Sequence, residues 1–361
     1  QNGGGIYLDL ASGTETKYDL TKTSYLTGNN AQYGKSLFIK AANLRTAVPM
    51  NDAARIKLGA LNPETDFYNL MGYDGSNTLA IPLYYVYTAV KNDIYHVNNA
   101  ASTYTIGSGY NNTFCGHYGW PCLTIGYAID QSGSATNKKV GIITGFKLSA
   151  STGIAKTGIQ ISNSLTATGS TTTTPSILLI ETAGKFSVTN GPVEFNYISF
   201  SINTNAGSGY VITGSTESTS STKITIDNCL MVMTGGSSSS ISVGLVQLNV
   251  GSLSISNLQA SSVNIASNSV IKVNNGAGEV NISGSKFSSV SRTGSGNGGA
   301  INAELNGGSK LTIKDGCEFS SCSCANGNGA AIYASLSSGS SGSVSITGTI
   351  STFSSCTVST T

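Results

Sequence analysis

Three similar stretches decide the fold of this chain: VNISGSKFSSV at residues 280–290, LTIKDGCEFSSC at 311–322 and VSITGTISTFSSC at 344–356. Each begins with an apolar–polar–apolar alternation and reaches an FSS triplet after a short polar turn. The alternation gives each short β-strand one apolar face. Such strands cannot bury that face alone, so stacking of similar units on one another is the expected solution.

The apolar pair also recurs upstream of these stretches, at offsets of 34, 31, 29, 27, 31 and 33 residues. The seven pairs are Ile159/Ile161, Val193/Phe195, Ile224/Ile226, Leu253/Ile255, Val280/Ile282, Leu311/Ile313 and Val344/Ile346. We assign a third apolar position to Leu165, Ile198, Cys229, Leu258, Phe287, Phe319 and Phe353, and a second strand to the surroundings of Leu178, Val211, Leu245, Ile271, Ile301 and Ile332. The pattern predicts an all-β fold, a right-handed parallel β-helix (solenoid) with coils of roughly 30 residues. An immunoglobulin-like sandwich is the rival, but its strands would not repeat one ordered set seven times.

The composition excludes several classes of protein. Hydrophobic residues make up 39% of the 361 residues, which is enough for a sizeable core and argues against disorder. Only 10% are charged and the net charge is +2, without the basic run that nucleic-acid binding requires. The longest apolar stretch, residues 79–90, contains Pro82 and is too short to span a bilayer.

The composition also divides the chain into three regions. Residues 1–94 form a Tyr-rich N-terminal extension without a repeat of its own, a candidate inter-subunit interface. Residues 95–135 form a capping segment, and residues 136–361 carry the β-helix repeats. Within the first region, Tyr84, Tyr85 and Tyr87 alternate around Val86. We interpret them as a strand with one buried face or an interface strand, the alternative being a platform for stacking sugars.

Two motifs resemble known families. GGAI at residues 298–301, together with the FSS triplets, resembles the GGAI and FxxN repeats of the polymorphic outer-membrane protein family, and similar repeats occur in surface proteins of microbial eukaryotes. CGHYGWPCLTIGYAI at 115–129 is similar to the PC-x-TI-x-x-AI segment that precedes right-handed β-helices in secreted proteins. Pro121 would begin a short helix whose face of Cys122, Ile125 and Ile129 covers the first coil. The resemblance implies a β-helix at the cell surface.

Cysteines and sequons provide the candidate modification sites. Seven cysteines cannot all pair within the chain. Cys115 and Cys122 are disulfide candidates, with two small buried hydrophobes as the alternative. Stacking would make Cys322 and Cys356 vertical neighbours, in a disulfide or a ladder of buried thiols. N-glycosylation sequons begin at Asn111 and Asn281.

The repeat region lacks the residue clusters that polysaccharide chemistry needs. From residue 151 onward it holds two aspartates, Asp227 and Asp315, about three coils apart, and one arginine, Arg292. A hydrolase needs two carboxylates flanking one bond, so we expect no catalytic site and no cofactor. His96 and His117 could join Cys115 and Cys122 around zinc, but their spacing fits no familiar motif and we expect no metal.

These observations favour an extracellular structural protein that assembles head to tail with itself into a surface filament or coat. The next strand is expected near residue 365, so the last coil is unfinished: either the chain was cut there, or another chain continues the stack and Phe353 would lie at the interface. The start at Gln1 indicates either a removed signal peptide or an arbitrary boundary of the expressed segment. The alternatives are an adhesin or glycan-binding stalk and, as a weaker hypothesis, a polysaccharide lyase or hydrolase. Partners are therefore other copies and glycans, not nucleic acid.

Overall fold

The computed structural model describes all residues except 26–27, 60–67, 100–108, 132–137, 168–172, 218–220, 235–238 and 360–361. The chain divides into two compact units, Gln1–Asp93 and Ile94–Thr361.

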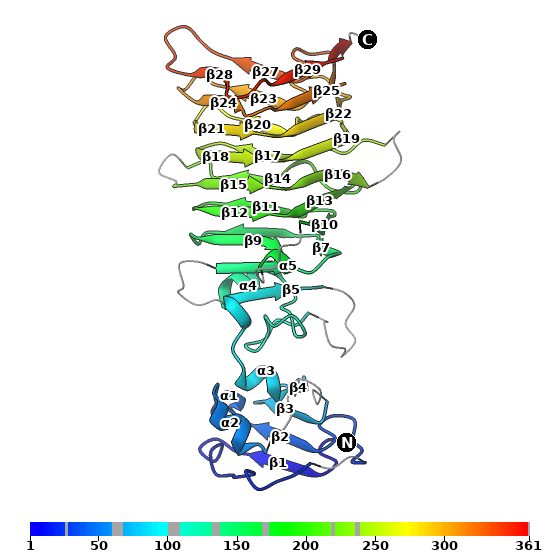
Figure 1. The fold of residues 1–361 in the computed structure, drawn as a ribbon, viewed down its shortest axis with the longest axis vertical. Coiled ribbons are helices and arrows are strands. Elements are labelled where there is room, and N and C mark those ends of the chain that lie inside the picture. The colour runs from blue at the N-terminus through cyan, green and yellow to red at the C-terminus, as the bar shows by residue number, and fades with distance from the viewer. Residues whose placement is uncertain are drawn as a thin grey trace. The chain divides into compact units, whose positions relative to one another are not determined.

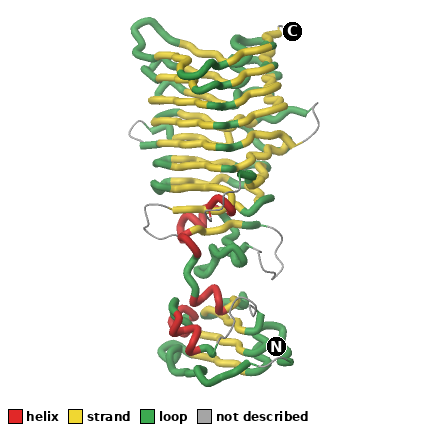
Figure 2. Tube along the Cα trace, in the orientation of Figure 1, coloured by secondary structure: helices red, strands yellow, loops and turns green. Residues whose placement is uncertain are grey.

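The second unit is a parallel β-solenoid, as the repeat predicts (Figure 1). The chain passes through three parallel sheets in turn and returns to the first after each coil (Figure 2). Sheet 1 contains β5 (Ile94–Val97), β6 (Lys138–Ile142), β9 (Ile159–Asn163), β12 (Val193–Asn196), β15 (Lys223–Asp227), β18 (Gly251–Ser256), β21 (Ala277–Ser283), β24 (Lys310–Lys314) and β28 (Ser343–Thr347). Sheet 2 contains β7 (Phe146–Leu148), β10 (Ser176–Ile180), β13 (Ile198–Asn203), β16 (Leu230–Thr234), β19 (Gln259–Ile265), β22 (Lys286–Arg292), β25 (Glu318–Ser320), β26 (Ser323–Ala325), β29 (Thr352–Ser354) and β30 (Thr357–Ser359). Sheet 3 contains β8 (Ser151–Ile154), β11 (Lys185–Val188), β14 (Gly209–Gly214), β17 (Val243–Leu248), β20 (Ile271–Val273), β23 (Ile301–Glu304) and β27 (Ile332–Ser335).

The seven apolar pairs form the inner rows of sheet 1, in the register that the offsets predict. Ile159 is paired with Val193, and the same step continues without a slip to Leu311 and Val344. These inner side chains are buried except in the last strand, β28. Loops of different length absorb the variation in offset, so the stacking is constant although the spacing is not.

In sheets 2 and 3 the predicted rows are partly wrong. The inner row of sheet 2 runs through Leu178, Phe200, Met231, Ala260, Phe287, Phe319 and Phe353. Ile198, Cys229 and Leu258 occupy the position two residues earlier, which also faces inward. Leu178 therefore belongs to sheet 2, and Leu165 is exposed in the short helix α5 (Ser164–Ala167). The row of sheet 3 runs through Ile212, Val246, Ile271, Ile301 and Ile332, so Val211 and Leu245 were placed one residue early.

The FSS triplets combine a core aromatic with a bend. The rings of Phe287, Phe319 and Phe353 stack at centroid distances of 5.0 and 4.8 Å, close to the spacing of neighbouring strands. The second serine of each triplet has a positive φ: 52° at Ser289, 51° at Ser321 and 52° at Ser355. The triplet therefore places phenylalanine inside and then bends the strand.

In the GGAI motif each residue has a structural reason. Gly298 has a φ of +72°, which suits glycine. A Cβ on Gly299 would lie 2.2 Å from the carbonyl oxygen of Ala330 in the next coil, so only glycine fits. Ala300 and Ile301 are buried. The motif is thus a turn that allows close stacking of coils.

The first unit contains a sheet of β1 (Ile6–Leu10), β2 (Leu37–Ala41), β3 (Leu70–Asp74) and β4 (Ile81–Pro82). The first three strands are parallel, with Ile6 paired to Leu37 and Leu37 to Leu70. Their steps are 31 and 33 residues, the same as the solenoid offsets. The expectation that this region has no repeat was therefore wrong. Helices α1 (Leu44–Ala47), α2 (Asp52–Lys57) and α3 (Leu83–Tyr87) and the 3-10 turn η1 (Lys91–Asp93) complete the unit.

The predicted tyrosine strand is also wrong, because Tyr84, Tyr85 and Tyr87 lie in the helix α3. Tyr85 and Tyr87 are buried, and burial raises the pKa of both phenols. Tyr84 makes edge-to-face contacts with both rings. The tyrosines pack with one another inside the unit, which leaves no exposed aromatic row for a sugar or a partner.

Candidate functional surfaces

The capping segment covers the first edge of sheet 1. The amide of His96 in β5 donates to the carbonyl of Gly116, and the amide of Cys122 donates to the carbonyl of His96. A disulfide joins Cys115 and Cys122, whose Cα atoms are 4.8 Å apart. The backbone amide and carbonyl of His96 on this edge of β5 are therefore paired within the chain, which protects the edge.

Helix α4 (Ile125–Gln131) follows, and its buried Ile125, Ala128 and Ile129 pack against β5, β6 and β8. The helix begins later than Pro121, because the preceding residues bridge to β5. The Oγ1 of Thr124 accepts a hydrogen bond from the amide of Tyr127. The sequence thus predicted the helix and its buried face correctly but its first residue wrongly.

Asn111 holds this helix start from the preceding loop. Its Oδ1 accepts from the amides of Leu123 and Thr124, and its Nδ2 donates to the hydroxyl of Thr124. The residue is nevertheless exposed, whereas the second sequon residue, Asn281, lies half-buried in β21.

His96 is the buried titratable group of this region. Only 4% of the residue is exposed, and burial lowers the pKa of its imidazole to about 4. The ring packs edge-on against Tyr118, with the two ring centroids 5.4 Å apart. Its Nδ1 has no hydrogen-bond partner among the described residues. Gly141 makes room for it, since a Cβ there would lie 2.8 Å from Nδ1.

Lys138 occupies an unexpected place in the inner row. It is paired with Ile159, where every later coil has an apolar residue, and it is buried. Its Nζ donates to the carbonyl oxygen of Ile129 at 3.1 Å, near the C-terminus of α4. Burial lowers its pKa. Periodicity alone did not reveal this residue, because two adjacent lysines look like solvent-exposed charge.

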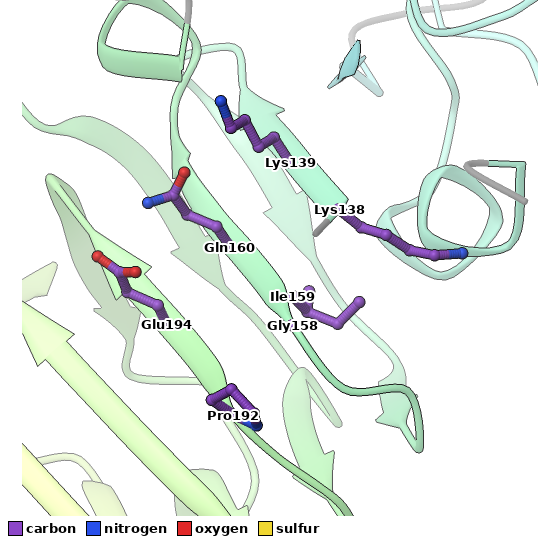
Figure 3. Close-up of a pocket in the computed structure, with 7 residues that line it drawn as sticks. All are labelled: Lys138, Lys139, Gly158, Ile159, Gln160, Pro192 and Glu194. Atoms are coloured by element: carbon purple, nitrogen blue, oxygen red, sulfur yellow. The ribbon is translucent and has the colours of Figure 1, made fainter. Parts of the chain in front are cut away.

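A shallow groove lies on the outer face of sheet 1, with a cavity volume of about 300 Å³ (Figure 3). The side chains of Lys139, Gln160 and Glu194 project side by side from β6, β9 and β12, whereas Lys138 extends toward α4 (Figure 3). The row presents a cation, an amide and a carboxylate on successive strands. It continues along the sheet through Thr225, Ser254, Asn281, Thr312 and Ser345.

This arrangement suits hydrogen bonding to a polar ligand. Glu194 is the one carboxylate among the described residues that line the groove. Among the described residues, no group of three or more His, Cys, Asp or Glu gathers where it could hold a metal ion.

The opposite edge of the solenoid is open. Within the described ranges, β28 pairs with β24 alone and β29 with β25 alone. Four large apolar side chains of this coil are 40% to 53% exposed, whereas their counterparts one coil earlier, Leu311, Ile313, Phe319 and Cys324, are fully buried. The four are Val344, Ile346, Phe353 and Val358.

The first unit also has an open edge, at β1. In the described part of the chain this strand pairs with β2 alone. Leu37 and Ile39 in β2 are buried, but Ile6, Leu8 and Leu10 in β1 are only half-buried. Tyr7, on the other face, stacks on Phe38 and is 45% exposed.

Cys322 and Cys356 are vertical neighbours, as stacking predicts, and both are free thiols. Each donates to a carbonyl one coil back, Cys322 to Phe287 and Cys356 to Phe319.

None of the helices in the described residues is long and apolar enough to cross a membrane. In comparisons with known proteins, the chain matches no family model, no curated protein and no solved structure.

Proposed function

We propose that this chain is an extracellular structural protein, a β-helical subunit of a surface filament or coat in which subunits stack head to tail. The observation that carries the proposal is the contrast between the two edges of the solenoid. Its own capping segment pairs with β5, whereas Val344, Ile346 and Phe353 in the coil of β28 and β29 are 40–53% exposed. Such an edge is a template for further strands.

The composition of the open edge supports assembly. Natural sheets protect exposed edges with lysine, proline or other charged residues. Strands β28, β29 and β30 contain none of these. β1 of a second copy is a fitting partner, since it repeats the alternation of apolar side chains and already belongs to a parallel stack with the solenoid's spacing.

Three features support an extracellular location. The Cys115–Cys122 disulfide suits an oxidising compartment. The low charge and the GGAI and FSS repeats resemble surface-exposed β-helix proteins. Peptide N-glycosidase treatment of protein from its source tests this directly, since it converts glycosylated Asn111 or Asn281 to aspartate. Absence of the protein from the surface of intact cells would contradict the location.

The assembly is tested by electron microscopy and sedimentation velocity of protein purified without refolding. We expect filaments whose axial repeat equals the length of one subunit. Ile346→Lys places a charge among the apolar side chains of this coil and should leave only monomers, because burial of an ammonium group costs free energy unless it gains a partner such as the Ile129 carbonyl that accepts from Lys138. Ser345→Lys, on the outer face of the same strand, is the matched control and should still assemble. Monomers at every concentration in the unmodified protein would refute the proposal.

A second candidate function, glycan binding, rests on the groove of sheet 1. Lys139, Gln160 and Glu194 offer donors and acceptors suited to sugar hydroxyls and carboxylates. Binding of the monomeric Ile346→Lys variant to a glycan array, lost on Gln160→Ala but retained on Asn281→Ala, would support an adhesin. No binding by this monomer would leave the structural role alone.

A further inference from the structure

Cys322 and Cys356 are set apart from the other free cysteines by their geometry. They occupy equivalent positions in neighbouring coils, because Ser320 pairs with Ser354 and Ser323 with Thr357. Neighbouring parallel strands lie about 4.8 Å apart, within the Cα separation that a disulfide spans.

The two thiols interact with each other and differ in access. Cys322 is fully buried, and its burial and the neighbouring thiol of Cys356 raise its pKa to about 12. Cys356 is only partly buried. A soluble disulfide reagent can therefore reach the Cys356 thiol. The buried Cys322 thiol is placed to displace that reagent from Cys356 afterwards.

We propose that Cys322 and Cys356 are a disulfide-forming pair, which a small oxidised disulfide such as oxidised glutathione converts into a covalent clamp between the last two coils. In the first step the Cys356 thiolate attacks one sulfur of the reagent, and one glutathione leaves as thiolate. In the second step the Cys322 thiolate attacks the Cys356 sulfur of the mixed disulfide and releases the second glutathione. The two cysteine protons pass to the two glutathione molecules, so the protein loses two hydrogen atoms and the reagent gains them.

Two of the three remaining free thiols provide internal controls. Cys229 is buried far from any other cysteine along the stack, and burial raises its pKa to about 12. Cys324 is paired with Arg292 and Val358, so no cysteine stands next to it in its row. We expect both to remain reduced under conditions that oxidise the pair.

The test treats the folded chain with oxidised glutathione, blocks the remaining thiols and digests it without reduction for mass spectrometry. We expect a cross-linked peptide pair that joins residues 322 and 356. Hydrogen exchange in β28–β30 should slow by at least about tenfold, because the closed loop resists detachment of the last coil. In Cys322→Ser, Cys356 should stop at the glutathione adduct.

Two results would overturn the inference: a stable glutathione adduct on Cys356 with Cys322 still reduced, or links from Cys322 to another cysteine. Because the reaction is read out in monomers, using Ile346→Lys, its outcome does not depend on whether the protein forms filaments.

Discussion

Acidification should destabilise the first coil of the solenoid through His96. The imidazole is neutral in the folded chain, where burial lowers its pKa from 6.5 to about 4. In the unfolded chain it binds a proton below pH 6.5. The unfolded state therefore binds more protons between pH 6.5 and 4, and stability must fall as the pH falls through this window. A difference of 2.5 pKa units corresponds to about 3 kcal/mol at pH 4.

The assay is urea unfolding between pH 7.5 and 4, followed by the fluorescence of Trp120. This is the chain's single tryptophan, and it lies buried in the same capping segment. Carboxylates titrate in this range too, so the informative quantity is the difference between the unmodified chain and His96→Gln. The variant should lack about 3 kcal/mol of the acid-induced loss, whereas His117→Gln should retain it. Equal pH dependence in the unmodified chain and His96→Gln would refute the reasoning.

Three further predictions concern the stacked coils and their cap. Phe319→Ala should lower the free energy of unfolding in urea by about 3–5 kcal/mol, because it leaves a cavity between two stacked rings. Phe353→Ala should lower it by about 1 kcal/mol in the monomer, because that ring is already half-exposed. Equal losses would contradict the stacking argument. Ser262→Val, at a φ of +53°, should destabilise by about 1–2 kcal/mol, and Ser261→Val by less than about 0.5 kcal/mol, so equal effects would refute a strained bend. Reduction of the capping-segment disulfide should lower stability by roughly 2–3 kcal/mol, with fluorescence and circular dichroism deciding whether the loss stays in the first coil.

The solenoid could be predicted from sequence because its inner rows repeat. In sheet 1 every coil from β9 onward begins with two apolar residues separated by one. Its register in the structure follows the predicted pairing from Ile159 to Val344. Because similar apolar residues stack on one another, the apolar pair recurs in the sequence even where the loops between coils differ in length.

Sheet 2 could not be placed in the same way, because two positions per coil face inward. Ile198 and Phe200 are both buried, and either could have continued the row. In the coil of β22, the first of the two positions holds Ser285, a small polar residue whose hydroxyl donates a hydrogen bond to the backbone carbonyl of Ser283. The later position is apolar in every coil, whereas the earlier one is apolar in some coils and serine in others. Where both positions are apolar, hydrophobicity alone does not tell which of them continues the row.

The first unit escaped prediction for a different reason. Its strands repeat at the solenoid spacing, but the third has Gly72 at an inward position, and helical segments separate the strands. With only three strands in the stack, the lack of an apolar side chain at Gly72 is enough to hide the apolar repeat. Only the hydrogen-bonded register of Ile6, Leu37 and Leu70 reveals the stack.

The outer surface is where sequence reasoning had least to work with. Packing constrains the inner rows, but outward residues such as Lys139, Gln160 and Glu194 satisfy the fold equally well with other polar side chains. No periodic pattern therefore singles them out, and their convergence appears only once the register is known. The coil of β28 and β29 is the opposite case: Val344, Ile346 and Phe353 follow the repeat in register, and only their exposure distinguishes them from their counterparts one coil earlier. In a solenoid, the repeat alone therefore predicts which residues lie in the inner rows of the terminal coils. The residues that gather on an outer face can be identified only once the structure gives the register of the strands.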